Sequence, residues 1–302
     1  MTLEENKLKK HAYLITAYNN QYQLEQLLSL LNHERNDIYL QIDSMGSLCI
    51  DTLTLNKSSL FILPPMPIYW AGFSFIQAEL NLLKAASDRR YHYYHLLSGA
   101  DLPLVGQDTI HTFLENSDLE YVDFAPGGLL RGHWKAAYIH FFVESKLYRN
   151  CVFIRILSHI LLNLQILFGM DRSKTFHETF DSGSSWFSVT HGFAEYILTH
   201  QAWIEKTFRY ALAGDEVFMQ TLIKKSPYKS KINSGVDGTT QNLRYIDWKR
   251  RDRNSPYTFT MSDYEELKEA SKHALFARKF NRTSDQGLVD TMVNRILNQG
   301  AL

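Results

Sequence analysis

The sequence predicts an α/β fold of three layers, with helices on both faces of a mostly parallel central sheet. One supporting observation is a strand, helix, strand unit at the start of the chain, and the other is that this alternation continues for most of its length. With 302 residues the chain can bury a core without disulfides or a structural metal. No internal repeat, low-complexity tract or linker divides it, so we expect one domain, residues 1–302.

The first unit begins with HAYLITAY, from His11 to Tyr18, an apolar and aromatic run typical of a buried strand. Leucines then recur at helical spacing, at positions 24, 27, 28, 30 and 31. DIYLQID, which ends at Asp43, predicts a second buried strand. Because parallel α/β sheets bind ligands at the carboxyl ends of their strands, Asp43 is predicted to face a ligand crevice.

The same alternation predicts the next elements. They are a strand at 59–63, a proline-rich turn at 64–67, a helix at 73–89 and a strand at 91–99, and then a helix at 108–116, a strand at 120–126, a strand leading into a helix at 184–200 and a strand at 243–248. Asp101 follows the strand at 91–99 and is expected to be exposed on a turn. Ser262 and Glu265 form a capping box, which predicts a helix ending in the cationic pair Arg278 and Lys279.

An apolar segment at 151–170 is interrupted by Arg155, His159, Asn163 and Gln165, which argues against a membrane span. A buried core helix is the favoured interpretation. The alternative is a helix that lies on a membrane surface.

Composition excludes some partners. Lys plus Arg equals Asp plus Glu at 32 each, so net charge does not recruit nucleic acid. The basic run at 247–254 is either a solvated loop or an anion site. Cys49 and Cys151 sit in apolar surroundings, which predicts buried thiols in a reducing compartment. The N-terminal residues lack a long apolar run, so neither a signal peptide nor an anchor is expected, and we expect a cytoplasmic protein.

The stretch YALAGDEVFMQTLI places Asp215 and Glu216 directly after a glycine, at the head of an apolar run. Asp215 is expected to cap or support the helix, since an Asp at this point satisfies free backbone N–H groups. Glu216 would lie in the first turn, where the helix dipole favours its ionised form. An ionised carboxylate is the state that a general base requires.

Four segments together resemble glycosyltransferase family 14, the core 2 and I-branching β-1,6-N-acetylglucosaminyltransferases and the peptide O-xylosyltransferases. YHYYHLLSGADLPL is similar to the family's strand and turn ending in Gly-x-Asp-x-Pro, and GSSWFSVTHGFAEYIL to its Gly-Ser-x-aromatic-Phe segment. GDEVFMQTLI is similar to its Pro-Asp-Glu segment, and ALFARKF to its closing Ala-x-Lys-Phe motif. The segments occur in the family's order between about residue 11 and residue 280.

The resemblance implies an A-type glycosyltransferase fold, with a nucleotide-binding half at about 11–125 and an acceptor and catalytic half at about 126–302. It makes Glu216 the catalytic base. The family uses an arginine and a lysine in place of a metal at the donor diphosphate, which here implies Arg244 and Lys279. Other arginines remain rivals of Arg244 for this role: Arg250, Arg251 and Arg278.

Other sequence features agree with a metal-independent site. The chain contains no Asp-x-Asp pair and none of the glycine-rich nucleotide-binding, HExxH, CxxC or GxSxG motifs. The scattered histidines, among them His92, His95, His133, His140 and His159, are expected to be structural, and no residue is assigned to a metal. We therefore expect no cofactor.

The resemblance also implies where the substrates bind. Nucleotide-binding candidates are Tyr18, Asp43, Trp70 and Ser74, with core packing as the alternative for Trp70. Asp101 and Trp186 are candidate acceptor contacts, with a turn-stabilising Asp and a buried Trp as the alternatives.

The implied reaction is an inverting transfer from a UDP-sugar to a glycan or glycolipid, giving a β-linkage. N-acetylglucosamine is the first expectation for the sugar, with xylose, glucose and glucuronic acid open. We expect a bacterial-type enzyme of surface polysaccharide or lipooligosaccharide synthesis, at the inner face of the cytoplasmic membrane. The alternative is a non-catalytic module of the same fold that binds nucleotide-sugar or carbohydrate, and the oligomeric state stays open. A glycoside hydrolase is excluded because adjacent Asp215 and Glu216 cannot flank a bond from opposite sides.

Overall fold

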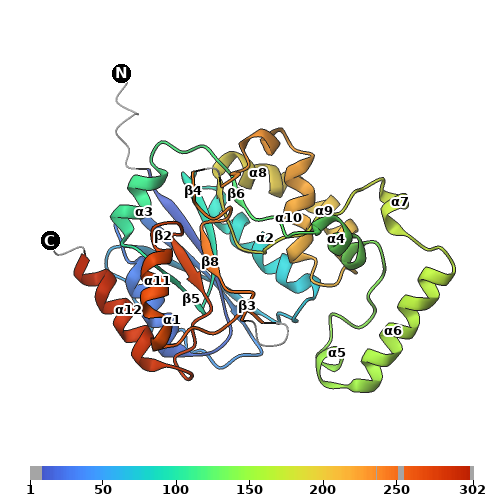
Figure 1. The fold of residues 1–302 in the computed structure, drawn as a ribbon, viewed down its shortest axis with the longest axis horizontal. Coiled ribbons are helices and arrows are strands. Elements are labelled where there is room, and N and C mark those ends of the chain that lie inside the picture. The colour runs from blue at the N-terminus through green and yellow to red at the C-terminus, as the bar shows by residue number, and fades with distance from the viewer. Residues whose placement is uncertain (1–8, 236, 251–254, 300–302) are drawn as a thin grey trace.

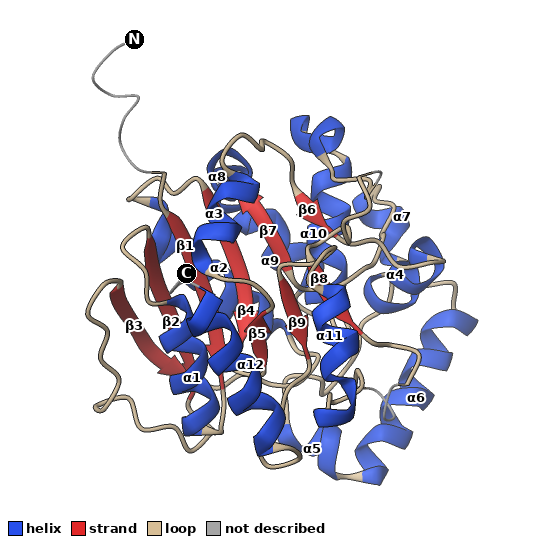
Figure 2. Ribbon diagram, turned by 60° about the vertical axis from the view of Figure 1, so that its left-hand side comes forward, coloured by secondary structure: helices blue, strands red, loops and turns tan. Residues whose placement is uncertain are grey.

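A six-stranded sheet with helices on both faces forms the centre of the protein (Figures 1 and 2). The computed structural model describes residues 9–235, 237–250 and 255–299. Strand order is β3 (Ser59–Met66), β2 (Asn36–Asp43), β1 (His11–Ala17), β4 (Tyr93–Ser98), β7 (Phe187–Thr190) and β6 (Tyr121–Val122). The pairs β1 with β2, β1 with β4 and β2 with β3 are parallel, whereas β7 is antiparallel to β4 and β6. The predicted mixed α/β fold with a mostly parallel sheet is confirmed.

A second, three-stranded sheet joins distant parts of the chain. Its order is β5 (Asp101–Pro103), β9 (Phe276–Arg278) and β8 (Arg244–Ile246). β5 begins just after the carboxyl end of β4, and its Asp101 lies opposite Arg278 of β9. The closing segment of the sequence is therefore brought to the carboxyl edge of the central sheet.

Alternating residues of β1 pack into two separate cores, which is why the fold has three layers. Tyr13 and Ile15 belong to the core formed with α1 (Gln21–Leu31), α3 (Gln107–Leu114), α11 (Tyr264–Ala270) and α12 (Gln286–Gln299). Ala12 and Leu14 belong to the core formed with α2 (Phe73–Ser87), α8 (His191–Thr199), α9 (Gln201–Phe208) and α10 (Asp215–Lys224). A strand buried on both faces explains the unbroken apolar run in its sequence.

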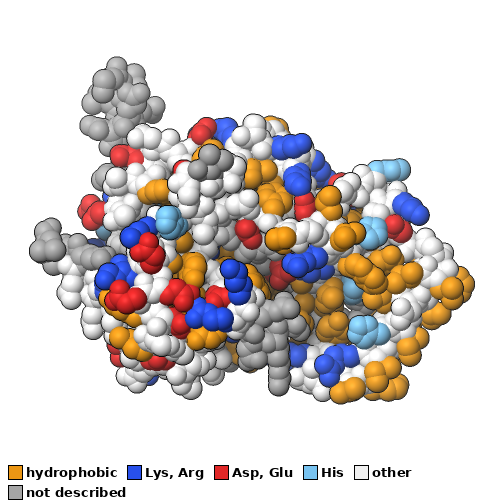
Figure 3. All heavy atoms as spheres, in the orientation of Figure 1, with side chains coloured by type: hydrophobic (Ala, Val, Ile, Leu, Met, Phe, Trp, Pro, Cys, Tyr) orange, Lys and Arg blue, Asp and Glu red, His pale blue; other side chains and the backbone are white. Residues whose placement is uncertain are grey.

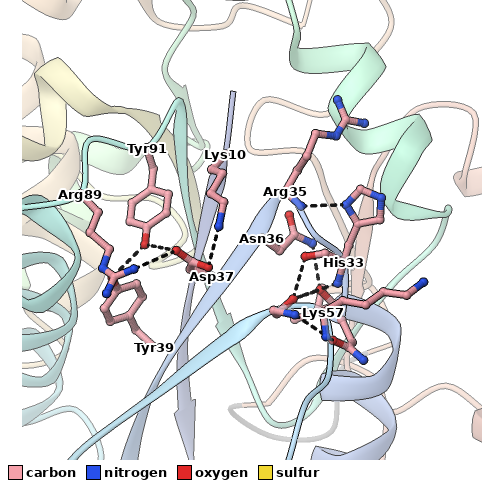
Figure 4. A network of polar contacts seen from close by, with 12 residues as sticks. Lys10, His33, Arg35, Asn36, Asp37, Tyr39, Lys57, Arg89 and Tyr91 are labelled. Carbon is pink, nitrogen blue, oxygen red and sulfur yellow. Dashed lines mark hydrogen bonds and ion pairs between the residues drawn. The ribbon is translucent and has the colours of Figure 1, made fainter. Parts of the chain in front are cut away.

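The amino-terminal edge of the central sheet is closed by polar contacts around the buried Asp37 (Figure 4). Its carboxylate accepts a hydrogen bond from the Tyr91 hydroxyl at 2.6 Å and forms ion pairs with Lys10 and Arg89 at 3.2 Å and 3.7 Å. Burial favours the protonated acid, but the hydrogen bonds from Tyr91 and Lys10 outweigh it and hold the pKa of Asp37 below its usual value. This edge is thus occupied by protein contacts.

The expected proline-rich turn at 64–67 is wrong, because β3 continues through both prolines to Met66. β3 is an edge strand, where a residue without an N–H is tolerated. The pairing register shifts between Gln41 and Asp43, and the side chain of Gln41 donates to the Pro64 carbonyl oxygen at 2.8 Å.

The long helix expected at 262–280 is also wrong. α11 ends at Ala270, and Arg278 lies in strand β9 because tertiary pairing with β5 and β8 overrides the local helical pattern. The capping box lies two residues earlier than expected, between Thr260 and Asp263 at the 3₁₀ helix Met261–Asp263. α12, which packs against α1, falls in a segment for which the sequence made no prediction.

Between β6 and β7 the chain forms an excursion of four helices: α4 (Gly128–Ala136), α5 (Lys146–Asn150), α6 (Val152–Leu167) and α7 (Arg172–Phe176). The favoured interpretation of 151–170 as a core helix is wrong, because Gln165 is the one buried residue of α6. The buried thiols expected are wrong as well, since Cys49 is exposed and Cys151 half-buried, and both are free. Among the helices of the described residues, none combines the length and the hydrophobicity that a bilayer crossing requires.

Candidate functional site

The carboxyl ends of β1 and β2 carry two of the predicted nucleotide-binding residues. Tyr18, directly after β1, is half exposed. Asp43, the last residue of β2, is buried, and its Oδ1 accepts the backbone N–H groups of Met45 at 2.9 Å and Ile68 at 3.2 Å. The loop after β2 packs directly against Tyr18: a Cβ on Gly46 would lie 1.7 Å from the Tyr18 carbonyl oxygen, so only glycine fits at this position.

The start of α2 carries the other two. Trp70 has 52% of its surface exposed, so the core-packing alternative is wrong. Ser74 is buried, and its hydroxyl accepts the Tyr69 N–H at 2.8 Å. The Ser74 N–H donates to Glu144 Oε1 at 2.8 Å, so a carboxylate from the helical excursion sits at the amino end of α2, where the helix dipole favours it.

The start of α10 lies beside the start of α2. The Ala213 N–H donates to the Ala71 carbonyl oxygen at 2.8 Å, which joins the two loops that precede these helices. Both alanines have left-handed φ values, 62° at Ala71 and 48° at Ala213, a conformation that costs on the order of 1 kcal/mol in a residue with a Cβ. The surrounding contacts thus hold a strained backbone at this point.

Glu216 lies in the first turn of α10 and presents its carboxylate at the surface, with 38% of the side chain exposed. Its partner is the Lys135 ammonium group of α4, which forms an ion pair with Oε2. A half-exposed carboxylate at this position is accessible to a substrate hydroxyl.

Asp215 does not cap α10, so the capping role expected for it is wrong, whereas the alternative of a supporting role stays a prediction. Gly214 occupies the N-cap position, and the Asp215 carboxylate accepts a hydrogen bond from the Ser185 hydroxyl at 2.6 Å. Burial raises the pKa of Asp215 to about 6, and the adjacent charge of Glu216 adds to the rise. Its other oxygen, Oδ1, is buried and has no hydrogen-bond partner in the described structure.

A second buried carboxyl group, Glu79 of α2, lies near enough to feel the charge of Asp215. Glu79 is fully buried, and neither carboxylate oxygen has a hydrogen-bond partner among the described residues. Burial raises the pKa of Glu79 well above its usual value, and the charge of Asp215 adds to this effect. The buried site of Glu79 therefore favours its protonated form.

The predicted acceptor residues meet the closing motif of the sequence. The Arg278 guanidinium donates to Asp101 Oδ1 at 2.7 Å and to the Ser98 hydroxyl, and it lies over the Trp186 ring at 4.3 Å. Asp101 is 2% exposed, so the exposed turn expected for it is wrong. It was misassigned because its burial depends on β9, far away in the sequence. Trp186 is also buried, as its alternative interpretation held.

Lys279 follows directly, and its ammonium group donates to the Ser255 hydroxyl at 3.2 Å. Burial lowers the pKa of Lys279, and the positive charge of Arg278 lowers it further. A half-buried cation held next to another cation is a position at which a bound anion would be strongly favoured.

Arg244 lies deeper in the protein than Arg278 and Lys279. It is buried, and its guanidinium donates to the carbonyl oxygens of Leu96 at 3.0 Å and Phe187 at 2.6 Å and to the Ser188 hydroxyl at 2.6 Å. Burial lowers the pKa of Arg244 to about 9. These contacts give Arg244 a place inside the protein, where both terminal nitrogens of its guanidinium donate to protein acceptors.

Two other arginines, Arg250 and Arg251, were alternatives to Arg244 as diphosphate ligands. Arg250 forms ion pairs with Asp247, Asp263 and Glu266, so that part of the basic run is neutralised by acids. Arg251 lies outside the described residues.

Contacts connect the two ends of the candidate site. Ser185 binds Asp215, the neighbour of Glu216, and the residue after Ser185 is Trp186, over which Arg278 lies. A short series of contacts therefore links the residue before Glu216 to Arg278, which Lys279 follows in the sequence. Among the described residues, no group of three or more His, Cys, Asp or Glu side chains is arranged to hold a metal ion.

Sequence reasoning missed four residues of this site: Lys135, Glu144, Ser185 and Glu79. Lys135 and Glu144 come from the helical excursion, which carries no motif that links it to α10 or α2. Ser185 stands inside the quoted GSSWF segment and could have been selected as a hydroxyl next to Trp186. Glu79 was detectable as an acid within the apolar pattern of the helix at 73–89.

The protonated state of Glu79 predicts a specific pH dependence. Burial raises the pKa of Glu79 in the folded state. Below the unfolded pKa of about 4.3, Glu79 is protonated in both the folded and the unfolded chain, so its burial as an acid costs no deprotonation free energy. As pH rises above that value, only the unfolded chain releases the proton, so stability is lost. We expect Glu79→Gln, which has no proton to release, to gain in free energy of unfolding relative to wild type between pH 5 and pH 8 in urea titrations.

The exposed Glu265 offers a matched control, because Glu265→Gln should differ from wild type by the same amount at both pH values. If the difference between Glu79→Gln and wild type is also independent of pH, Glu79 is not held protonated by the fold.

Comparison with known proteins finds related sequences. The chain is 24% identical to xylosyltransferase 2 of Rattus norvegicus, over 94% of its own length and 33% of that protein. It is 23% identical to xylosyltransferase 1 of Homo sapiens, over 88% of its own length and 28% of that protein. The chain thus spans about a third of these curated relatives.

A solved structure described as the apo form of the bifunctional glycosyltransferase WbbM aligns with 90% of the chain and 46% of its own, with 8% identity and a TM-score of 0.42. The model of the Core-2/I-Branching enzyme family matches residues 11–271, most of the chain. The protein therefore belongs to the Core-2/I-branching enzyme family.

Proposed function

We propose that this protein is an inverting glycosyltransferase that moves a sugar from a UDP-sugar to a hydroxyl group of a glycan or glycolipid, forming a β-linkage. The observation that carries the proposal is the series of contacts that runs from Asp215, the neighbour of the accessible carboxylate Glu216, through Ser185 and Trp186 to Arg278, which Lys279 follows. Family membership supports the same chemistry.

In the proposed reaction Glu216 removes the proton from the acceptor hydroxyl. The hydroxyl oxygen attacks C1 of an α-linked donor sugar, the bond from C1 to the phosphate oxygen breaks, and UDP leaves with the bonding electrons. Positioning and general-base assistance share the catalysis. Lys135 acts as a positioning residue, because its ion pair holds the carboxylate at the start of α10.

Arg278 and Lys279 would stabilise the negative charge that develops on the β-phosphate. Of the arginines considered from the sequence, Arg278 suits this role better than Arg244, since Arg244 is buried among protein acceptors. We therefore assign the diphosphate to Arg278 with Lys279. Asp101 then serves to hold Arg278, a role that replaces its expected contact with the acceptor.

The other predicted site residues keep their roles as proposals. Tyr18 and Trp70 are exposed aromatic side chains suited to stacking on a base, and Asp43 and Ser74 shape the loops beside them. The Trp186 ring packs against the Arg278 guanidinium, and Trp186 remains the proposed acceptor contact.

For the donor we propose UDP-N-acetylglucosamine first, and UDP-xylose next, because the relatives in the comparison are named xylosyltransferases. UDP-glucose and UDP-glucuronic acid complete the panel. For the acceptor we propose a glycan of a bacterial surface polysaccharide or lipooligosaccharide, extended at the cytoplasmic face of the inner membrane. The alternative of a non-catalytic binding module is tested directly by UDP release with this panel.

Glu216→Gln tests the proposed base. The variant should keep its affinity for UDP and lose turnover, on the order of a hundredfold or more, because an amide cannot accept the proton. Glu195→Gln, an exposed change on α8, is the matched control and should retain activity. Turnover close to wild type in Glu216→Gln would remove this residue from the role.

Metal independence has its own test. Since two side-chain cations are proposed to neutralise the diphosphate, UDP release should continue at an undiminished rate in excess EDTA. A complete loss of activity that manganese restores would contradict the assignment of Arg278 and Lys279.

A further inference from the structure

α6 displays an unpartnered apolar face. Figure 1 shows α5 and α6 projecting from one side of the molecule, away from the central sheet, and Figure 3 shows hydrophobic side chains gathered on that side. The exposed apolar side chains of α6 and its C-cap residue include Val152, Phe153, Ile156, Ile160, Leu164, Leu167 and Phe168, with exposed fractions from 42% to 76%. A soluble surface rarely leaves so many large apolar side chains contiguous without a partner.

The face is organised rather than scattered. Most of these residues recur every three or four positions, so they lie along one side of the helix. The opposite side faces the protein. There the Ile139 backbone N–H donates to Gln165 Oε1 at 2.8 Å, and Gln165 Nε2 donates to the Ile139 carbonyl oxygen at 2.9 Å. The Ser158 hydroxyl also donates to the Phe141 carbonyl oxygen at 3.2 Å. α6 is therefore fixed with its apolar face outward.

The charges of this region are of one sign. Residues 146–170 contain Lys146, Arg149 and Arg155 and no Asp or Glu, in a chain whose total charge is zero. All three cations are exposed, and none forms an ion pair within the part of the chain that the structure describes. A helix with an apolar face flanked by cations matches the interface of a bilayer that contains acidic lipids.

A second copy of the chain fits this surface less well. A two-fold interface would place identical patches against each other and would bring the same cations together. Sixteen residues of helix are also too short to cross a bilayer. We propose that the α5–α6 surface, defined by the seven apolar residues named above and by Lys146, Arg149 and Arg155, binds an anionic lipid membrane with α6 lying in the membrane plane.

This surface adjoins the candidate site. Glu144, two residues before α5, holds the start of α2, and the charge of Arg149 in α5 contributes to the lowered pKa of Lys279. A membrane bound there would present a lipid-linked acceptor next to Glu216 and the donor cations. This consequence rests on the proposed function, whereas membrane binding itself does not.

Co-sedimentation of the full chain with vesicles tests the inference without any substrate. The protein should sediment with phosphatidylcholine vesicles containing about a third phosphatidylglycerol, and binding should weaken as salt is raised. Ile156→Glu combined with Ile160→Glu should reduce vesicle affinity by at least about tenfold. Leu297→Glu, an equally exposed leucine on α12, is the matched control and should bind as wild type does.

The cations provide a second variant that leaves the apolar face intact. Replacing Lys146, Arg149 and Arg155 by Gln should weaken binding to acidic vesicles by about fivefold per residue. Failure of wild type to bind acidic vesicles would overturn the proposal, as would a dimer in sedimentation velocity that Ile156→Glu with Ile160→Glu abolishes. UDP release with a soluble acceptor, measured in parallel, shows separately whether the proposed function fails.

Discussion

The ion pair between Asp101 and Arg278 is the contact on which the proposed site depends. It links the end of β4 to β9 across more than half of the chain, and both partners are largely buried. Losing one partner of such a pair leaves the other charge uncompensated, at a cost on the order of 3–5 kcal/mol. Because Asp101 Oδ2 also accepts the Ser98 N–H at 2.6 Å, the pair attaches β9 directly to the edge where the parallel strands end.

From this attachment the chemistry of the edge follows. Arg278 lies over Trp186, the loop that contains Trp186 binds Asp215 through Ser185, and Asp215 precedes Glu216. Arg278 and Glu216 are thus connected through one series of contacts, with the cation at one end and the carboxylate at the other. The buried Glu79 and the raised pKa of Asp215 show that this region tolerates carboxyl groups with incomplete hydrogen bonding. Such local cost is common where a fold holds functional groups in place.

The sequence predicted well what depends on local periodicity. β1, α1 and β2 appear where apolar spacing placed them, and their parallel pairing puts Asp43 at the expected edge. It predicted poorly what depends on distant partners. Asp101 is buried by β9, Arg278 is strand rather than helix because β5 and β8 pair with it, and Arg244 points inward because of its register with Phe276. None of these outcomes is encoded within a few residues of the position concerned.

α6 is a further case in which the sequence pattern does not identify the tertiary partner. An apolar helical pattern shows that a face must avoid water, but not which partner covers it. Lys135 and Glu144 were missed for a related reason, since they reach α10 and α2 from an excursion with no motif of its own. The sequence predicts which helix or strand carries a site residue. It does not predict toward which distant element the side chain of that residue points.

The central claim, that Arg278 and Lys279 hold a sugar nucleotide diphosphate, is tested most directly by calorimetric titration of UDP and the four UDP-sugars into wild type and Lys279→Met. Wild type should bind UDP and at least one UDP-sugar, and Lys279→Met should bind about tenfold or more weakly, as expected for a lost charge-assisted hydrogen bond. Lys249→Met, on the exposed loop after β8, should bind like wild type. Equal affinity of wild type and Lys279→Met for every ligand would contradict the account.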